Sequence, residues 1–224
     1  MNRRRSSILV TGVALVALAL APVTSAQEAT TLEREGCTIV GTSGPDRLDG
    51  TNHADVICAL GGADVIDGLR GQDLIYGGSG RDLIDGSEGA DRILGGPGAD
   101  RIRGDQGRDR LIGGGGSDTL YGLSNEDVLL GGPGADLLNG GYDDDVLRGH
   151  SGEDRIFANF GIDHVLGGRG DDACLSTLDP GAIPPEPPDT MRGGPGFDSY
   201  HADENDHVFG VEAVPAHPCD YGPS

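Results

Sequence analysis

The residues best suited to chemistry in this chain are aspartates that recur every nine positions. Fifteen of them follow one another in unbroken phase through residues 41–175, each at the sixth position of a nine-residue unit. A carboxylate is an oxygen ligand, so rows of carboxylates favour a hard cation. The candidate metal ligands are Asp46, Asp55, Asp64, Asp73, Asp82, Asp91, Asp100, Asp109, Asp118, Asp127, Asp136, Asp145, Asp154, Asp163 and Asp172.

Calcium is the cation that this pattern favours. Stacked units would bring equivalent carboxylates to within about 4.8 Å of each other, and like charges at that distance repel unless a cation neutralises them. Calcium accepts six to eight oxygens in irregular geometry, from carboxylates and carbonyls alike, whereas magnesium requires a tight octahedron. Without calcium, a chain this acidic and glycine-rich is expected to be disordered.

The elements that must position these carboxylates are turns and very short strands. Two residues after each Asp stands Leu, Ile or Val, from Leu48 to Val165, with Cys174 as the exception in the last unit. Alternation places this aliphatic residue on one side of a three-residue strand and its neighbours on the other. Because one unit cannot bury its apolar side alone, the units must stack into a solenoid, two units to a coil.

Glycine occupies the first position in thirteen units and the fourth position in twelve. It tolerates positive φ and lets neighbouring backbones approach closely, and stacked turns need both properties. Asn125 and Asp143 replace the fourth-position glycine in two units, where left-handed backbone is still accessible to them. His53 and Phe160 are expected to mark weakened sites.

The units resemble the RTX repeats of haemolysin-type calcium-binding proteins, with the consensus G-G-x-G-x-D-x-U-x, where U is a large aliphatic residue. Four units match fully: GGSGRDLID (77–85), GGPGADRIR (95–103), GGGGSDTLY (113–121) and GGPGADLLN (131–139). The turn glycines of these units are Gly77, Gly80, Gly95, Gly98, Gly113, Gly116, Gly131 and Gly134.

This resemblance implies an all-β, right-handed parallel β-roll with 18 residues per coil and capping segments, which binds several Ca²⁺ ions between its turns. Sites would form between units n and n+2 on one edge, which allows at most 15 − 2 = 13 of them. Residues 193–198 restore one similar turn and add Asp198 as a ligand. The resemblance does not imply an enzyme, because catalytic activities belong to separate domains in the family.

The chain divides into five segments. Residues 1–26 read as a secretory signal peptide, with arginines at 3–5, an apolar stretch and small residues before Ala26. Residues 27–40 are an N-terminal cap, 41–175 the repeats, 176–192 a Pro-rich loop, and 193–224 a partial repeat with a final capping strand at Val208. This organisation predicts a secreted, extracellular protein with no membrane span after cleavage. The N-terminal signal departs from the C-terminal export signal common in the family.

Four cysteines in an exported chain suggest two disulfides. Cys37 with Cys58, and Cys174 with Cys219, would staple the two ends of the repeat array, although three connectivities are open. Cys58 is expected to point outward, and Cys174 to face the core at the last rung.

Composition narrows the choice of function. The net charge is −21, and all sixteen cations are arginine. Such a surface repels nucleic acid, the absence of lysine excludes a P-loop, and no H-E-x-x-H or G-x-S-x-G motif is present. Apart from calcium, the expected partners are a cell-surface protein or a glycan. The outward positions of the even-numbered units form an apolar stripe; either the C-terminal segment or a partner covers it, or a β-roll tolerates such residues there. The alternatives to a calcium-binding protein are a calcium-dependent adhesin or interaction module and, disfavoured by the short coil, a polysaccharide-active β-helix enzyme.

Overall fold

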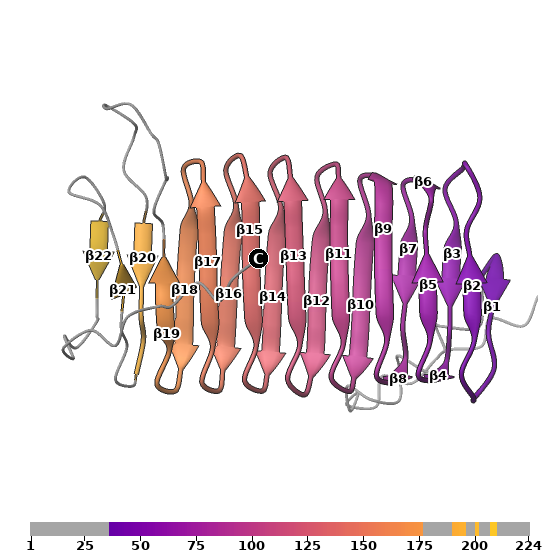
Figure 1. Ribbon diagram of the computed structural model, residues 1–224, viewed down its shortest axis with the longest axis horizontal. Coiled ribbons are helices and arrows are strands. Elements are labelled where there is room, and N and C mark those ends of the chain that lie inside the picture. Colours follow the sequence, from indigo (N-terminus) through magenta and orange to yellow (C-terminus); the bar gives the residue numbers. More distant parts are fainter. Residues whose placement is uncertain (1–35, 177–189, 196–199, 202–206, 210–224) are drawn as a thin grey trace, which may run out of the picture.

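The computed structural model describes residues 36–176, 190–195, 200–201 and 207–209. These residues form strands and turns without a helix, wound into a parallel solenoid along one long axis (Figure 1). Paired strands lie 18 residues apart, as in the register Ile93↔Leu111. The predicted all-β β-roll with two units per coil is confirmed. The described part contains no helix of the length and apolarity that a membrane span requires.

One wall, which we call the even sheet, carries the strands of the even-numbered units, together with strands that lie before and after the repeats. Its strands pair in the order in which they occur along the chain. They are β1 (Ile39–Val40), β3 (Val56–Cys58), β7 (Leu74–Tyr76), β10 (Arg92–Pro97), β12 (Arg110–Gly115), β14 (Val128–Pro133), β16 (Val146–Ser151), β18 (His164–Arg169), β20 (Thr190–Arg192) and β22 (His207–Phe209).

The opposite wall, the odd sheet, carries the strands of the odd-numbered units. They are β2 (Arg47–Asp49), β5 (Val65–Asp67), β9 (Leu83–Gly89), β11 (Arg101–Gln106), β13 (Thr119–Ser124), β15 (Leu137–Tyr142), β17 (Arg155–Phe160), β19 (Ala173–Ser176) and β21 (Tyr200–His201). The short strand β6 (Arg70–Gly71) pairs with β9, and β4 (Gly61–Gly62) pairs with β8 (Ser79–Gly80).

The core is a double row of the aliphatic residues at the eighth position. From Ile57 to Val165 each of them is at most 1% exposed, and Leu48 packs against them while partly buried. Ala59 and Ala158, which replace the first-position glycine, are fully buried as well. The first position therefore also faces the interior.

The strands are longer than the sequence predicts. From β9 to β18 they run for six or seven residues and include the first three residues of the following unit, as Gly104, Asp105 and Gln106 do in β11. The reason is that residues at the second position continue the pairing although their φ is positive, as in Leu123 at 85° and Asp105 at 75°. The predicted tolerance of Asn125 and Asp143 is confirmed, with φ of 77° and 74°.

First-position and fourth-position glycines are needed for different reasons. No first-position glycine is among the residues with positive φ in the described part, but a Cβ on Gly77 would lie 2.7 Å from the carbonyl oxygen of Gly95 in the next coil. The fourth-position glycines from Gly80 to Gly170 combine positive φ with an even closer approach. A Cβ on Gly116, whose φ is 130°, would lie 1.5 Å from the carbonyl oxygen of Gly98.

Gly116→Ala is expected to destabilise the calcium-loaded protein by about 2–4 kcal/mol, because it adds a backbone clash to a strained φ. Gly115→Ala is the matched control. Gly115 directly precedes Gly116, its φ is not positive, and there is open space where its Cβ would stand. Thermal unfolding followed by circular dichroism measures both variants. Equal midpoints for the two would contradict the close packing of the turns.

The C-terminal end differs from the sequence prediction. The loop predicted over 176–192 ends earlier, because β20 (Thr190–Arg192) joins the even sheet and Met191 is fully buried in the core row. Cys174 is therefore not on the last rung, since β20, β21 and β22 stack beyond β19. Periodicity missed β20 because an insertion shifts it out of the nine-residue frame. The strand predicted around Val208 is present as β22.

The N-terminal end is closed by a disulfide between Cys37 and Cys58, with a Cα–Cα distance of 6.0 Å. One of the two predicted pairs is thereby confirmed. Cys58 stands at an outward position of the frame and is only 1% exposed, because it is bonded to Cys37. Cys219 and the signal peptide lie outside the described residues, so the second pair stays a prediction.

Candidate metal sites in the turns

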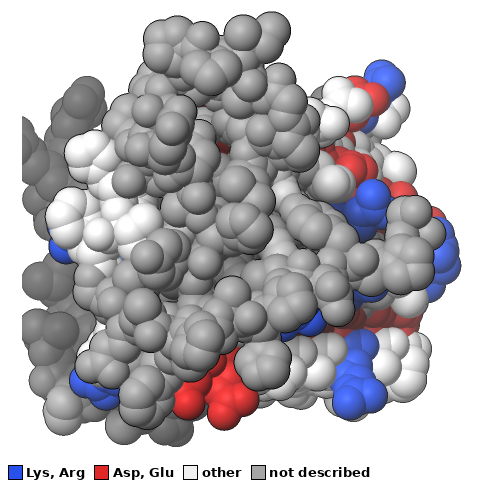
Figure 2. All heavy atoms as spheres, turned by 60° about the vertical axis from the view of Figure 1, so that its left-hand side comes forward, with Lys and Arg blue, Asp and Glu red and all other residues white. Residues whose placement is uncertain are grey.

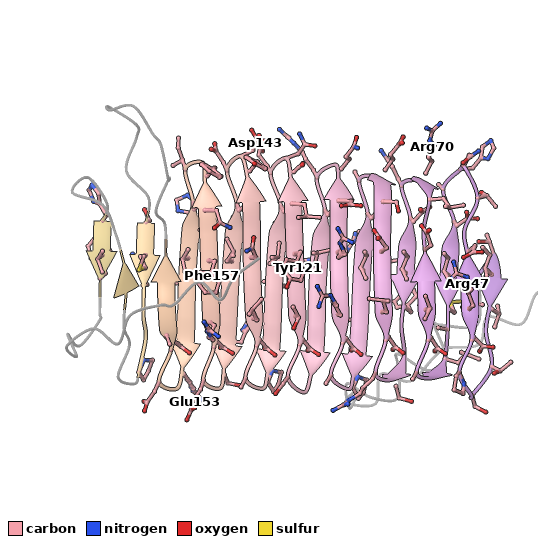
Figure 3. All side chains as sticks on the ribbon, in the orientation of Figure 1. Arg47, Arg70, Tyr121, Asp143, Glu153 and Phe157 are labelled. Atoms are coloured by element: carbon pink, nitrogen blue, oxygen red, sulfur yellow. A yellow bond between two sulfur atoms is a disulfide. The ribbon has the colours of Figure 1, made fainter. Side chains whose placement is uncertain are left out.

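The periodic aspartates form two ladders, one along each edge of the solenoid. Hydrogen bonds join aspartates 18 residues apart, which keeps the odd and the even units separate. The two edges are seen in Figure 3, where Asp143 lies on the edge of the even turns and Glu153 on the edge of the odd turns. Because the units alternate between the two walls, the odd units form one ladder and the even units form the other.

These carboxylates are buried. From Asp55 to Asp172 the exposed fraction of each ladder aspartate is between 0% and 7%, whereas Asp46 at the N-terminal end is half-buried. The Oδ1 atom of each Asp from Asp64 to Asp172 accepts a hydrogen bond from the backbone N–H of the Asp in the preceding coil, at 2.8–3.0 Å. Hydrogen bonds thus hold one oxygen of each carboxylate in place.

The second oxygen is the unusual one. In the described residues, the Oδ2 atom of each ladder Asp from Asp64 to Asp154 is buried and has no hydrogen-bond donor. An unsatisfied buried acceptor costs about 1–3 kcal/mol, and more if it is charged. A row of such atoms is therefore unstable unless a proton or a cation supplies the missing partner.

The space beside Oδ2 suits a cation with oxygen ligands. A Cβ on Gly95 would lie 2.5 Å from Asp100 Oδ2 and 2.6 Å from the carbonyl oxygen of Gly113 in the next coil. A carboxylate oxygen and a main-chain carbonyl oxygen thus lie close to the same point, with no side chain between them. The same arrangement recurs at Gly113, with Asp118 Oδ2 at 2.5 Å and the Gly131 carbonyl oxygen at 2.8 Å.

The ligands cannot all be side chains. Nowhere in the described part do three or more His, Cys, Asp or Glu side chains meet in a way that would hold a metal ion. Each site must combine carboxylates with backbone carbonyls, a donor set that suits a hard ion such as calcium and not a soft transition metal. The residues present therefore fit calcium.

Burial and mutual repulsion raise the pKa of these carboxyl groups. Desolvation, followed by the charges of Asp109 and Asp73, raises the pKa of Asp91 to about 7. The same two causes, burial first, raise the pKa of Asp127 to about 8 and that of Asp145 to about 9. Without a cation, the ladders hold charge at neutral pH only at a cost in stability.

The first two turns are different, because a threonine follows their first glycine. Thr42 donates its backbone N–H and its hydroxyl to Asp46 Oδ2 at 2.5 and 2.9 Å, and Thr51 makes the same two bonds to Asp55 Oδ2 at 2.7 and 2.8 Å. Although burial opposes ionisation, these bonds lower the pKa of Asp55. Asp46 and Asp55 were predicted as metal ligands, but here their Oδ2 atoms already have donors.

Sequence reasoning could have found this exception. Threonine at the second position is visible in both units, and a hydroxyl four residues before an Asp can reach its carboxylate. Asp198, the last predicted ligand, lies outside the described residues. Asp163 and Asp172 are buried in the ladders like their neighbours.

Comparison with known proteins supports this interpretation of the turns. Seven overlapping segments match the model of the RTX calcium-binding nonapeptide repeat: 38–66, 59–93, 85–120, 94–129, 121–156, 130–165 and 148–175. They cover residues 38–175 without a gap. No curated protein matches the chain.

Proposed function

The chain belongs to the family of RTX calcium-binding nonapeptide repeats, and on this premise we propose that it is a secreted protein that binds several Ca²⁺ ions in its turns and folds when they bind. The observation that carries the proposal is the row of buried Oδ2 atoms without a donor, from Asp64 to Asp154. A cation in each turn would satisfy them. We assign no reaction to the chain.

The proposed ligands are the sixth-position aspartates from Asp64 onward, together with carbonyl oxygens of the turns on the same edge. Asp46 and Asp55 are not among the proposed ligands, because their Oδ2 atoms already accept hydrogen bonds from Thr42 and Thr51. Calcium supplies positive charge where buried carboxylates face one another, so part of its binding free energy becomes folding free energy.

The proposed secretion rests on the signal-like residues 1–26 and on the chemistry of the ladders. Calcium is scarce in the cytosol and abundant outside cells. A chain that needs calcium to neutralise its ladders would remain unfolded during export and fold on arrival.

The test is a count of bound calcium by atomic emission after dialysis of residues 27–224. Asp118→Asn is expected to lower the number of bound ions by at least one, because it removes a ligand oxygen from a buried turn. Asp46→Asn is the matched control and should leave the number unchanged. Equal calcium contents for both variants and the parent, or full replacement of calcium by magnesium at equal concentration, would refute the proposed sites.

A calcium-dependent adhesin or interaction module is the second candidate. The observation that favours it is the outer surface of the even sheet, where apolar residues such as Leu94, Ile112 and Leu130 remain partly exposed in adjacent strands. On the described part of the face visible in Figure 2, acidic side chains and arginine side chains lie next to one another. Light scattering that finds only monomers, together with binding of a hydrophobic dye to the folded protein, would count against a partner that covers this surface.

A further inference from the structure

The third-position residues of the even turns form a continuous column along one edge. Parallel pairing places them side by side in adjacent coils: Glu88↔Gln106, Gln106↔Ser124, Ser124↔Tyr142 and Tyr142↔Phe160. We call this column the even rim. Asp143, which follows Tyr142, marks the same edge in Figure 3. Neighbouring members are about 4.8 Å apart, the spacing of paired strands.

The even rim ends in two stacked aromatic rings. Tyr142 and Phe160 have ring centroids 5.0 Å apart and planes inclined by 5°. Tyr142 is nevertheless 60% exposed. Because Phe160 covers one face of the tyrosine ring, the exposed area belongs to the opposite face and the edge. On the side away from Phe160, the partner of Tyr142 in the sheet is Ser124, which has a small side chain.

Polar groups without partners continue the even rim beyond the ring. Within the described residues, the hydroxyl of Ser124 and the side-chain amide of Gln106 have no hydrogen-bond partner. Further along, a groove of about 350 Å³ is lined by Gln106, Glu88 and Arg70 among others. An open aromatic face therefore leads into a row of hydrogen-bonding groups and a groove.

The open aromatic face and the hydrogen-bonding groups beside it together have the chemistry of a saccharide site. Sugar rings present an apolar C–H face that packs on an aromatic ring, while their hydroxyl groups bond to amides, hydroxyls and carboxylates around the edge. Asp143 and Asp144 are exposed nearby and would repel an anionic ligand.

We propose that the even rim binds a neutral, unbranched oligosaccharide, with one sugar ring stacked on the free face of Tyr142. The proposal goes beyond calcium binding: it uses the folded, calcium-loaded chain but none of the ladder aspartates. The competing interpretation is that the two rings only stabilise the pairing of β15 with β17, as cross-strand aromatic pairs do.

The test is a titration of calcium-loaded residues 27–224 with cellohexaose, followed by nuclear magnetic resonance. Tyr142→Ser, which copies the residue of the preceding coil, is expected to weaken binding about tenfold or more, the loss of one aromatic stacking contact. Tyr121→Ser is the matched control, because the Tyr121 ring lies under the guanidinium of Arg101 and is not a member of the even rim. A hyaluronan hexasaccharide, which is anionic, should bind at least about tenfold more weakly than cellohexaose.

Three outcomes would overturn the saccharide site: no binding of cellohexaose at millimolar concentration, equal affinity of the parent and Tyr142→Ser, or equal losses in Tyr142→Ser and Tyr121→Ser. The calcium content and far-ultraviolet spectrum of each sample are measured alongside. A normal calcium content without sugar binding refutes only the saccharide site. Sugar binding by a folded chain that holds no calcium refutes only the proposed function.

Discussion

Removal of calcium from residues 27–224 is expected to abolish the β-sheet signal, and its return is expected to restore that signal cooperatively. The reason is the number of buried carboxylates, of which each ladder Asp from Asp64 to Asp154 leaves one oxygen without a donor. One site filled at a hundred times its dissociation constant contributes about 2.7 kcal/mol. A domain is stable by only about 5–15 kcal/mol, so a few sites account for all of its stability.

Far-ultraviolet circular dichroism during a calcium titration after chelation measures this transition. Magnesium at the same concentration is the control, and it should fail because turn carbonyls and carboxylates do not offer a tight octahedron. A full β signal in chelator, unchanged by calcium, would show that the ladders are stable without a cation.

Acid is expected to substitute for calcium. The ordinary pKa of these carboxyl groups is 3.8, and burial, with repulsion from neighbouring aspartates, raises it in the folded chain to about 7 in Asp136, about 8 in Asp127 and about 9 in Asp145. A raised pKa of an acid means that the folded state binds more protons than the unfolded one. The stabilisation is complete below pH 3.8 and is lost as the pH rises through about 7 to 9.

The chelated protein should therefore show β structure near pH 4 and lose it near pH 9, whereas the calcium-loaded protein should be folded at both. Asp145→Asn imitates the protonated acid, so it is expected to stabilise the chelated protein at pH 8 and to destabilise the loaded one. Glu153→Gln removes a charge from an exposed position and serves as the control. A chelated protein that is more stable at pH 9 than at pH 4 would contradict the sign of this argument.

The nine-residue period was sufficient to predict the fold. It determines which residues face the core, and the row from Ile57 to Val165 is buried as expected. The same period failed at β20, because Thr190–Arg192 lies beyond an insertion and only its pairing with β18 returns it to the core. Long-range pairing after an insertion leaves no local pattern to detect.

The sequence predicted where the candidate ligands lie, but not how the two oxygens of each carboxylate are hydrogen-bonded. The spacing located every ladder aspartate, yet it could not reveal that Oδ1 and Oδ2 differ, since that depends on an N–H 18 residues away. Nor did it separate Asp46 and Asp55 from the others. Their distinction depends on single threonine hydroxyls, which a consensus built on glycine and aspartate overlooks.

The disulfide and the two threonine-capped turns lie at the same end of the molecule, and this gives assembly a direction. The first coil closes by a covalent bond and its carboxylates need no ion. Growth of a solenoid proceeds by adding coils to an existing edge. A chain that emerges N-terminus first would present this ion-independent coil as the template. Each ion that binds would then stabilise one further coil and oppose backward movement of the chain. Hydrogen exchange at limiting calcium should then protect the N-terminal coils first; protection that begins in the C-terminal coils would reverse the direction.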